Sequence, residues 1–182
     1  QTDGKSNALS FDVALPLSDY RYFKASANHA SYQPLSDNLT LKLTGNLGLI
    51  SGYSGKEAPF FKRYFGGGSG SVRGFGNRSL GPTYPNSATK GGELSVLGSV
   101  NIISPASFMT NNENMRVSAF VDVGNIFEKS SNMKLGDLRM SAGIAFAYLS
   151  PIGAIGAYWS TPILKKAGDD IENFSFSLGT GF

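Results

Sequence analysis

Residues 138–148, LRMSAGIAFAY, alternate between larger apolar side chains and small or polar ones. The even-numbered positions from Leu138 to Tyr148 are apolar or aromatic, and the odd-numbered positions from Arg139 to Ala147 are mostly small. Successive side chains of an extended strand point to opposite faces, so a period of two predicts a β-strand with one greasy face.

The same alternation recurs along the whole chain. The other alternating segments are 9–15, 23–28, 39–49, 94–102, 115–123, 155–160 and 174–182. They predict about eight strands of roughly 9–14 residues, which is longer than the usual strand of a soluble protein. A strand needs about 9–11 residues to cross a bilayer at a steep tilt, so these lengths fit a membrane wall.

The segments between the strands differ in length on the two sides of the predicted sheet. Short turns at 16–19, 34–37, 104–105 and 150–153 separate some strands, and long polar loops at 51–92, 128–137 and 165–172 separate others. Short turns at one end and long loops at the other are typical of an outer-membrane barrel. We therefore predict an all-β fold, an antiparallel transmembrane β-barrel meander with its greasy side chains facing lipid and its small hydrophilic ones facing the interior.

Two other folds are alternatives to the barrel. A soluble β-sandwich also alternates, but its outward faces should be charged, whereas here the second face of each strand holds mainly Ser, Thr, Gly and Asn. A helical membrane span could fit the uncharged stretch 140–164 by length. However, Ser150 and Pro151 stand at its centre and its period is two, so a strand–turn–strand hairpin explains it better.

Composition removes several classes of function. The 182 residues suit one domain, and 16 Lys+Arg against 13 Asp+Glu leave a formal charge of +3, too small to indicate nucleic-acid binding. The sequence contains no cysteine, which excludes disulfides and thiol chemistry. His29 is the only histidine, its phase places it on the weakly apolar face, and no acidic cluster has metal-ligand spacing. We therefore predict no enzyme activity, no metal and no cofactor.

The stretch 66–82, GGGSGSVRGFGNRSLGP, lies inside a connection far longer than the usual four to six residues or so. Its glycines alone would suit a flexible linker, but five aromatic residues stand within it or just before it, and a solvated linker has little use for them. These are Phe60, Phe61, Tyr64, Phe65 and Phe75. We predict an ordered loop that folds back onto the protein and brings Arg73 to a buried acidic partner.

Several motifs resemble those of the BamA family of outer-membrane β-barrel assembly factors. The long loop carries them at 55–61 (GKEAPFF), 64–67 (YFGG) and 71–75 (SVRGF). The likeness continues at 120–124 (FVDVG), 139–145 (RMSAGIA) and 150–153 (SPIG), and it ends at the terminal aromatic Phe182. The arginine motif alone is shared by a wider superfamily that includes TamA-like proteins and two-partner secretion transporters.

The resemblance implies a sixteen-stranded barrel preceded by POTRA domains. Residues 1–182 would then be the C-terminal part of the barrel domain, with a long extracellular loop at about 52–92 and with the POTRA domains and N-terminal strands absent. In the family this loop enters the barrel, and its arginine contacts acidic residues on the wall. The loop motif here is Val72, Arg73, Gly74 and Phe75.

The expected partners of Arg73 lie on strands of the wall. The family's acidic position matches Asp122, which the alternation independently places on the interior face. A second acidic position of the family falls on Asn101, and Glu93 on the same strand is a candidate substitute for the missing carboxylate.

The function that the resemblance implies is the folding and insertion of β-barrel proteins into the bacterial outer membrane, without nucleotide or cofactor. We assign the last strand to a lateral seam that pairs with client strands. Its residues are Asn173, Phe174, Phe176, Leu178, Gly179, Gly181 and Phe182. The expected partners are nascent outer-membrane proteins, accessory lipoproteins, and outer-membrane lipid and lipopolysaccharide.

Three alternatives stay open at this point. The chain could serve polypeptide secretion, as TamA-like proteins or two-partner secretion transporters do. It could be a small closed barrel that acts as an anchor, although an eight-stranded barrel has room for little beyond its own side chains. The chain by itself could also associate with a second copy.

Overall fold

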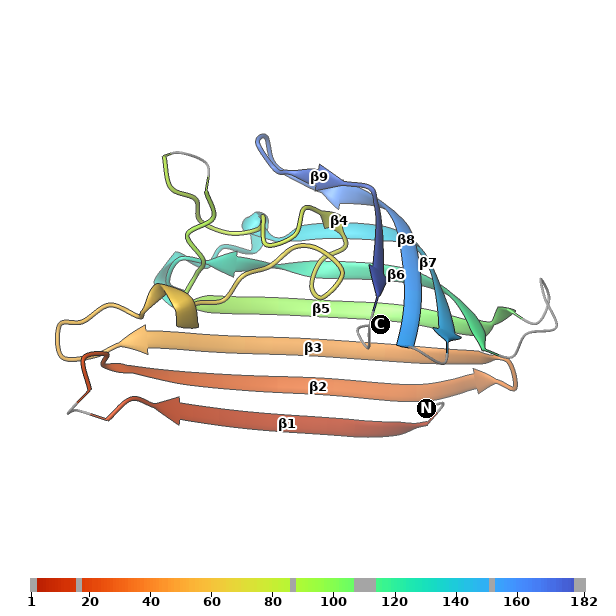
Figure 1. The fold of residues 1–182 in the computed structure, drawn as a ribbon, viewed down its shortest axis with the longest axis horizontal. Helices are drawn as coiled ribbons and strands as arrows, with labels where there is room; N and C mark the ends of the chain where they lie inside the picture. Colours follow the sequence, from red (N-terminus) through yellow and green to blue (C-terminus); the bar gives the residue numbers. More distant parts are fainter. Residues whose placement is uncertain (1–2, 16–17, 86–87, 107–113, 151–152, 179–182) are drawn as a thin grey trace.

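The computed structural model describes residues 3–15, 18–85, 88–106, 114–150 and 153–178. Eight antiparallel strands form one sheet in the order β1-β2-β3-β5-β6-β7-β8-β10, so each strand pairs with its neighbour along the chain (Figure 1). The wall strands are β1 (Gly4–Val13), β2 (Tyr22–Ser36), β3 (Leu39–Gly52), β5 (Leu94–Pro105), β6 (Met115–Phe127), β7 (Arg139–Ser150), β8 (Gly153–Leu164) and β10 (Phe174–Leu178). The predicted all-β antiparallel meander is confirmed.

The remaining elements are short and belong to the loops. The strands β4 (Gly74–Phe75) and β9 (Ile171–Glu172) pair with each other as a separate two-stranded sheet. Three 3-10 turns complete the described structure: η1 (Phe60–Lys62), η3 (Ser130–Asn132) and η4 (Leu135–Asp137). Within the described residues, no helix is both long enough and apolar enough to cross a membrane.

One face of the sheet carries the greasy side chains, and nothing in the described structure covers them. Leu9 is 84% exposed, Trp159 56% and Phe176 68%, and all three point away from the interior by their register. In a soluble sandwich such side chains would meet across two layers and be buried. Their exposure therefore agrees with the orientation that the alternation predicts, greasy side chains outward and small hydrophilic ones inward.

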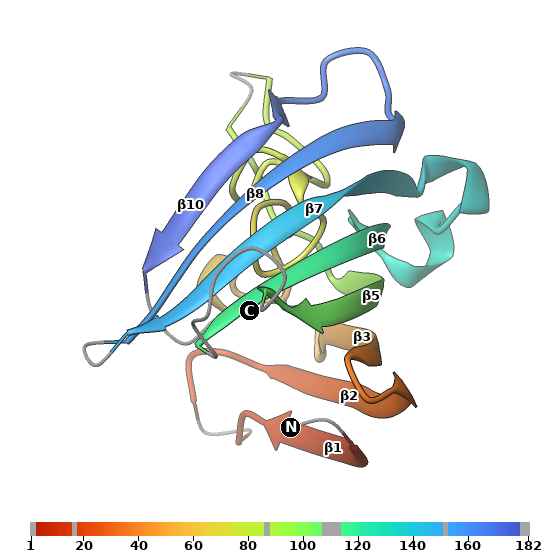
Figure 2. The same cartoon turned by 90° about the vertical axis from the view of Figure 1, so that its right-hand side faces the viewer.

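The opposite face is concave and polar, and the long loop lies against it (Figures 1 and 2). Its buried residues include Asn101, Asp122, Ser141 and Ser160, which belong to four neighbouring strands. The sheet is open in the described residues, because β1 pairs only with β2 and β10 pairs only with β8. The alternative of a small closed barrel is thus not what the structure shows.

One turn differs from the prediction. The sequence indicated a turn beginning at Pro34, but β2 continues through Pro34 to Ser36, with a register shift between them. Proline has no N–H for a strand ladder. Within the described residues this is harmless, because the pairing with β1 ends at Tyr32 and no described strand residue pairs with Pro34 on that side. The hairpin 140–164, by contrast, is the strand–turn–strand unit that was predicted.

Candidate functional site: an arginine loop docked on the inner wall

The connection between β3 and β5 is an ordered loop, as its aromatic content predicted. Tyr64 pairs with Gly92 and Gly66 with Leu80 through isolated bridges, which join parts of the loop that are distant in sequence. The Tyr64 hydroxyl donates to the Ala25 carbonyl of β2 at 3.2 Å, which ties the loop base to the wall. Phe60 and Phe65 pack edge to face at 5.5 Å between ring centroids.

The tip of the loop has a small core of its own. Val72, Phe75 and Leu80 are at most 1% exposed and form one apolar cluster, against which Leu97 of β5 packs from the wall. Burying a side chain of this size stabilises a fold by about 1.5–3 kcal/mol. The apolar side chains on either side of Arg73 therefore hold the loop in place independently of its charge.

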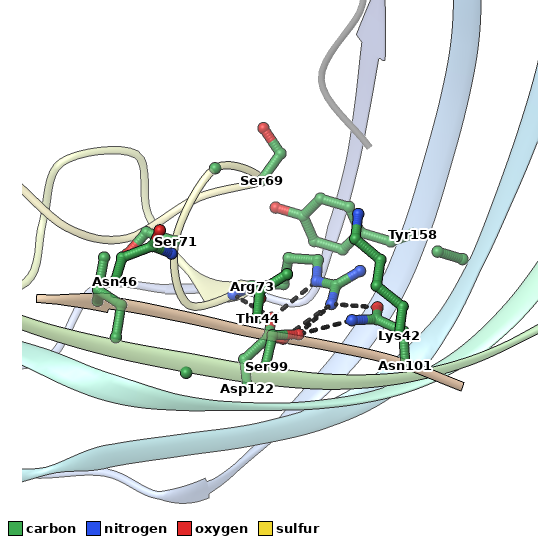
Figure 3. Close-up of a pocket in the computed structure, with 14 residues that line it drawn as sticks. Lys42, Thr44, Asn46, Ser69, Ser71, Arg73, Ser99, Asn101, Asp122 and Tyr158 are labelled. Carbon is green, nitrogen blue, oxygen red and sulfur yellow. Dashed lines mark hydrogen bonds and ion pairs between the residues drawn. The ribbon is translucent and has the colours of Figure 1, made fainter. Parts of the chain in front are cut away.

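Arg73 reaches the wall at Asp122 on β6 through its backbone and its side chain (Figure 3). The carboxylate oxygen Oδ2 accepts from the Arg73 backbone N at 3.1 Å and from Nε at 2.7 Å. The other oxygen, Oδ1, accepts from Nη2 at 2.8 Å. The Asp122 side chain is 0% exposed and that of Arg73 14%, so this two-pronged ion pair is largely withdrawn from water.

Two residues of β5 complete the polar contacts of Arg73. Asn101 Oδ1 accepts from Nη2 at 2.9 Å, so this amide also binds the guanidinium. The Ser99 hydroxyl donates to Asp122 Oδ1 at 2.6 Å and accepts from Asn101 Nδ2 at 2.8 Å. Ser99 thereby links the two partners of Arg73, and it also lies 3.3 Å from Nη2.

The prediction that Glu93 replaces the missing acid does not match this geometry. The described hydrogen bonds of Arg73 go to Asp122, Asn101 and Ser99. Glu93 lies just before β5 begins, where its backbone pairs with Ile50 and Glu128. It is six positions from Ser99 along the strand, roughly 20 Å at the rise of about 3.3 Å per residue.

An aromatic platform supports the guanidinium from below. Arg73 Cζ lies 3.4 Å from the ring centroid of Phe120. The Phe120 ring in turn meets Tyr158 edge to face at 6.3 Å. A cation held over an aromatic face is stabilised by about 0.5–2 kcal/mol, with the larger values away from water. Gly143 makes room for this ring, since a Cβ there would lie 2.7 Å from Phe120 Cζ.

Gly74 lets the loop lie flat on the wall. Its φ of +92° is a conformation that side-chain-bearing residues rarely adopt. A Cβ at this position would also stand 3.0 Å from Ser160 Oγ and 3.4 Å from Ser141 Cβ. The serines of β7 and β8 thus form a floor that admits glycine after Arg73.

Sequence reasoning missed Ser99, Phe120 and Tyr158. Ser99 faces Asp122 directly in the β5–β6 register and lies on the same face as Asn101, so the alternation alone could have placed it there. Phe120 alternates in phase with Asp122, and its size was the available signal that it lies beside Arg73. No signal in the sequence indicates that Tyr158 supports that ring.

The proposed seam residues lie partly within the described structure. Phe174, Phe176 and Leu178 are exposed on the outer face of β10, and the Asn173 carbonyl accepts from Ser160 N at 2.8 Å. Gly179, Gly181 and Phe182 lie outside the described residues. Among the described residues, no group of three or more His, Cys, Asp or Glu could hold a metal ion.

A curved meander that is apolar outside and carries an inward-folded arginine loop defines a class, the outer-membrane barrel proteins with a loop docked on the inner wall. The Omp85 superfamily domain matches residues 2–182, and the chain belongs to that superfamily.

The relatives of the chain are assembly factors. The outer membrane protein assembly factor BamA of Neisseria meningitidis serogroup B is 32% identical over 210 residues, covering 100% of this chain and 26% of that protein. The factor of the same name from Nitratidesulfovibrio vulgaris is 26% identical over 170 residues, covering 90% of this chain and 21% of that protein. The chain thus spans about a quarter of the length of these curated relatives.

A solved structure shares the fold. BamA from Haemophilus ducreyi lacking POTRA domains 1–3 matches with a TM-score of 0.83 and 35% identity, over 96% of this chain and 38% of that one. The predicted family resemblance is confirmed by these comparisons.

Proposed function

We propose that the chain is the C-terminal half of the barrel of an assembly factor that folds and inserts β-barrel proteins into the bacterial outer membrane. The full protein would have sixteen barrel strands preceded by POTRA domains. The observation that carries the proposal is the Arg73 loop docked on Asp122, together with the similarity to BamA along the whole chain. The work is templating by backbone pairing, and it requires no nucleotide and no cofactor.

The role that we assign to β10 is that of a seam strand. Among the described residues, β10 pairs with residues 155–159 of β8. Beyond Ser160, the described part of β8 has a strand neighbour only in β7. A free edge can accept an incoming strand. This feature supports lateral opening beside β10.

The partners follow from this role. We propose nascent outer-membrane proteins as clients, accessory lipoproteins as members of the complex, and outer-membrane lipid and lipopolysaccharide as surroundings. The docked loop would serve to hold the inner wall in one shape while the seam works. In the full-length protein it would also fill space that a secretion channel needs to keep open.

The experiment is depletion of the full-length protein in its own host, followed by measurement of many unrelated outer-membrane barrels. An assembly factor predicts that their folded, heat-modifiable forms decline together. Loss of one exported protein with normal barrels would instead indicate a secretion transporter, and it would overturn the proposal. Reconstitution in lipid vesicles with a urea-unfolded barrel client gives the same choice without a cell.

A further inference from the structure

The segment 165–173 between β8 and β10, which we call the strap, touches both the docked loop and the wall. Figure 1 shows it crossing beside β4, with β9 inside it. The described contacts on its two sides are different in kind. Backbone hydrogen bonds join it to the Arg73 loop, and ion pairs join it to β7 and the loop before β7.

The backbone side grips the residues that directly follow Arg73. Gly74 pairs with Glu172 and Phe75 with Ile171 in the β4–β9 ladder. The Gly76 N–H donates to the Asp170 carbonyl at 2.9 Å. The approach is close, because a Cβ on Gly76 would lie 2.0 Å from Asp170 Oδ2.

The ion pair that fixes the strap to the wall is at Asp169, one residue before Asp170. Asp169 receives two hydrogen bonds from Arg139, from Nε to Oδ2 at 2.7 Å and from Nη2 to Oδ1 at 2.8 Å. The two side chains are only 12% and 10% exposed. Asp169 Oδ2 also accepts from the Lys166 backbone N at 2.6 Å, which closes the strap into a tight turn.

Arg139 is well placed to act as an anchor. It begins β7 and pairs in register with Gly124 of β6, the strand that carries Asp122 two residues away. Its Nη1 donates to the Asp137 carbonyl at 2.6 Å, so the loop before β7 also holds the guanidinium. A second ion pair joins Lys166 to Asp137, but these side chains are 48% and 32% exposed and the pair is correspondingly weaker.

We propose that Arg139 and Asp169 are positioning residues for Arg73. They clamp the strap to the wall, and the strap holds the loop segment after Arg73 against the inner face by backbone pairing. Since the strap continues directly into β10, the clamp places the docked loop and the seam strand relative to each other. The inference deepens the proposed function by naming what holds the loop, but the clamp can be tested without any client.

The test uses the full-length protein with one cysteine as a reporter, any cysteines elsewhere being replaced by serine. Residues 1–182 contain no cysteine of their own. Val72→Cys is the reporter of docking, because Val72 is 0% exposed when the loop is in place. Gly70→Cys is its matched control, because Gly70 is exposed and a Cβ there meets nothing within 4 Å. The readout is the rate of labelling by a maleimide in detergent-solubilised protein.

Breaking the clamp should expose the reporter and leave the control unchanged. Arg139→Gln and Asp169→Asn should each raise the labelling rate of Val72→Cys by about tenfold or more, since removing one partner of a buried ion pair is strongly destabilising. Lys166→Gln, which removes the exposed pair of the same strap, should change it less than about twofold. Arg139→Lys keeps the charge and loses the second hydrogen bond, so it should fall between these values.

Unchanged protection of Val72→Cys in both clamp variants would overturn the proposal, and so would an equal effect of Lys166→Gln. Heat-modifiable mobility on gels reports whether the barrel has folded. If Arg139→Gln fails that check, Asp169→Asn decides the question. Raised labelling of Val72→Cys in the clamp variants together with normal client assembly would support the clamp and count against the proposed function of the loop.

Discussion

Arg73 and Asp122 are joined by three hydrogen bonds, and one of them comes from the arginine backbone. The carboxylate therefore fixes the path of the loop as well as its charge. Asp122 is wholly buried while the loop is docked, so in that state its charge depends on Arg73 as its partner. Removing one partner of such a pair destabilises by about 3–5 kcal/mol.

Asp122→Asn should therefore undock the loop while keeping the shape of the side chain. Protease cleavage between 66 and 80 in the folded barrel should become fast, where the parent resists it. Arg73→Glu should have the same effect, and adding Asp122→Arg should restore part of the resistance. If the double variant is no more resistant than Arg73→Glu alone, the contact does not hold the loop.

Gly74→Ala should undock the loop without removing any polar group. Alanine at a φ of +92° is strained, and its Cβ would press on Ser160 Oγ. Backbone strain of this kind is worth about 1–3 kcal/mol. Gly70→Ala is the matched control, because a Cβ there meets nothing within 4 Å. Equal protease resistance in the two variants would show that the wall tolerates a side chain after Arg73.

Glu93 and Asn101 should respond differently to loss of their polar groups. Asn101→Leu removes one of the acceptors of Arg73 Nη2 and the donor that Asn101 Nδ2 supplies to Ser99, so the loop should become more sensitive to protease. Glu93→Gln should leave the protease resistance unchanged, because Glu93 lies away from the guanidinium. The reverse order of sensitivities would restore Glu93 as the substitute acid.

The strap should loosen only in acid. Burial opposes ionisation of Asp169, but the hydrogen bonds from Arg139 and the Lys166 backbone outweigh it and lower the pKa of this carboxyl. A lowered pKa in the folded state means that the clamp is fully formed above the ordinary range of Asp and is lost as pH falls through the lowered value.

Amide exchange of the Gly76 N–H, corrected for its intrinsic pH dependence, should therefore show constant protection from about pH 8 to pH 5 and a decline below about pH 4. Asp169→Asn should remove that decline, because no carboxyl is left to titrate. A transition near neutral pH that survives in Asp169→Asn would point to another group.

The wall could be predicted from sequence because its physics is local. The two faces of each strand meet different environments, which appear in the sequence as an alternation of side chains. The apolar positions of 39–49 and 115–123 can therefore be assigned to the lipid face without knowledge of neighbouring strands. The register then places Asp122, Ser99 and Asn101 on the inner face. The same reasoning placed a turn at Pro34, where β2 in fact continues. The residues around Pro34 do not show where the pairing with the neighbouring strand ends.

The contacts of the loop could not be predicted in this way. The pairing of Gly74–Phe75 with Ile171–Glu172 involves two residues on each side, too few to produce a period. Asp169 and Arg139 are thirty positions apart and look like ordinary polar residues at the ends of strands. The composition of the loop predicted an acidic partner for Arg73, and the family resemblance pointed to Asp122, whereas the aromatic platform and the strap required the folded structure.

The two unpaired edges of the described sheet affect how residues 1–182 should behave when they are produced alone. On the outer rims of β1 and β10, amide and carbonyl groups have no ladder partner in the described chain. In hydrocarbon each such group is penalised by several kcal/mol, roughly enough over one strand to outweigh the whole stability of an ordinary domain. Recombinant material of 19.3 kDa should therefore migrate in native gels as dimers or larger oligomers. A monodisperse monomer would mean that β1 and β10 had paired with each other and closed the sheet.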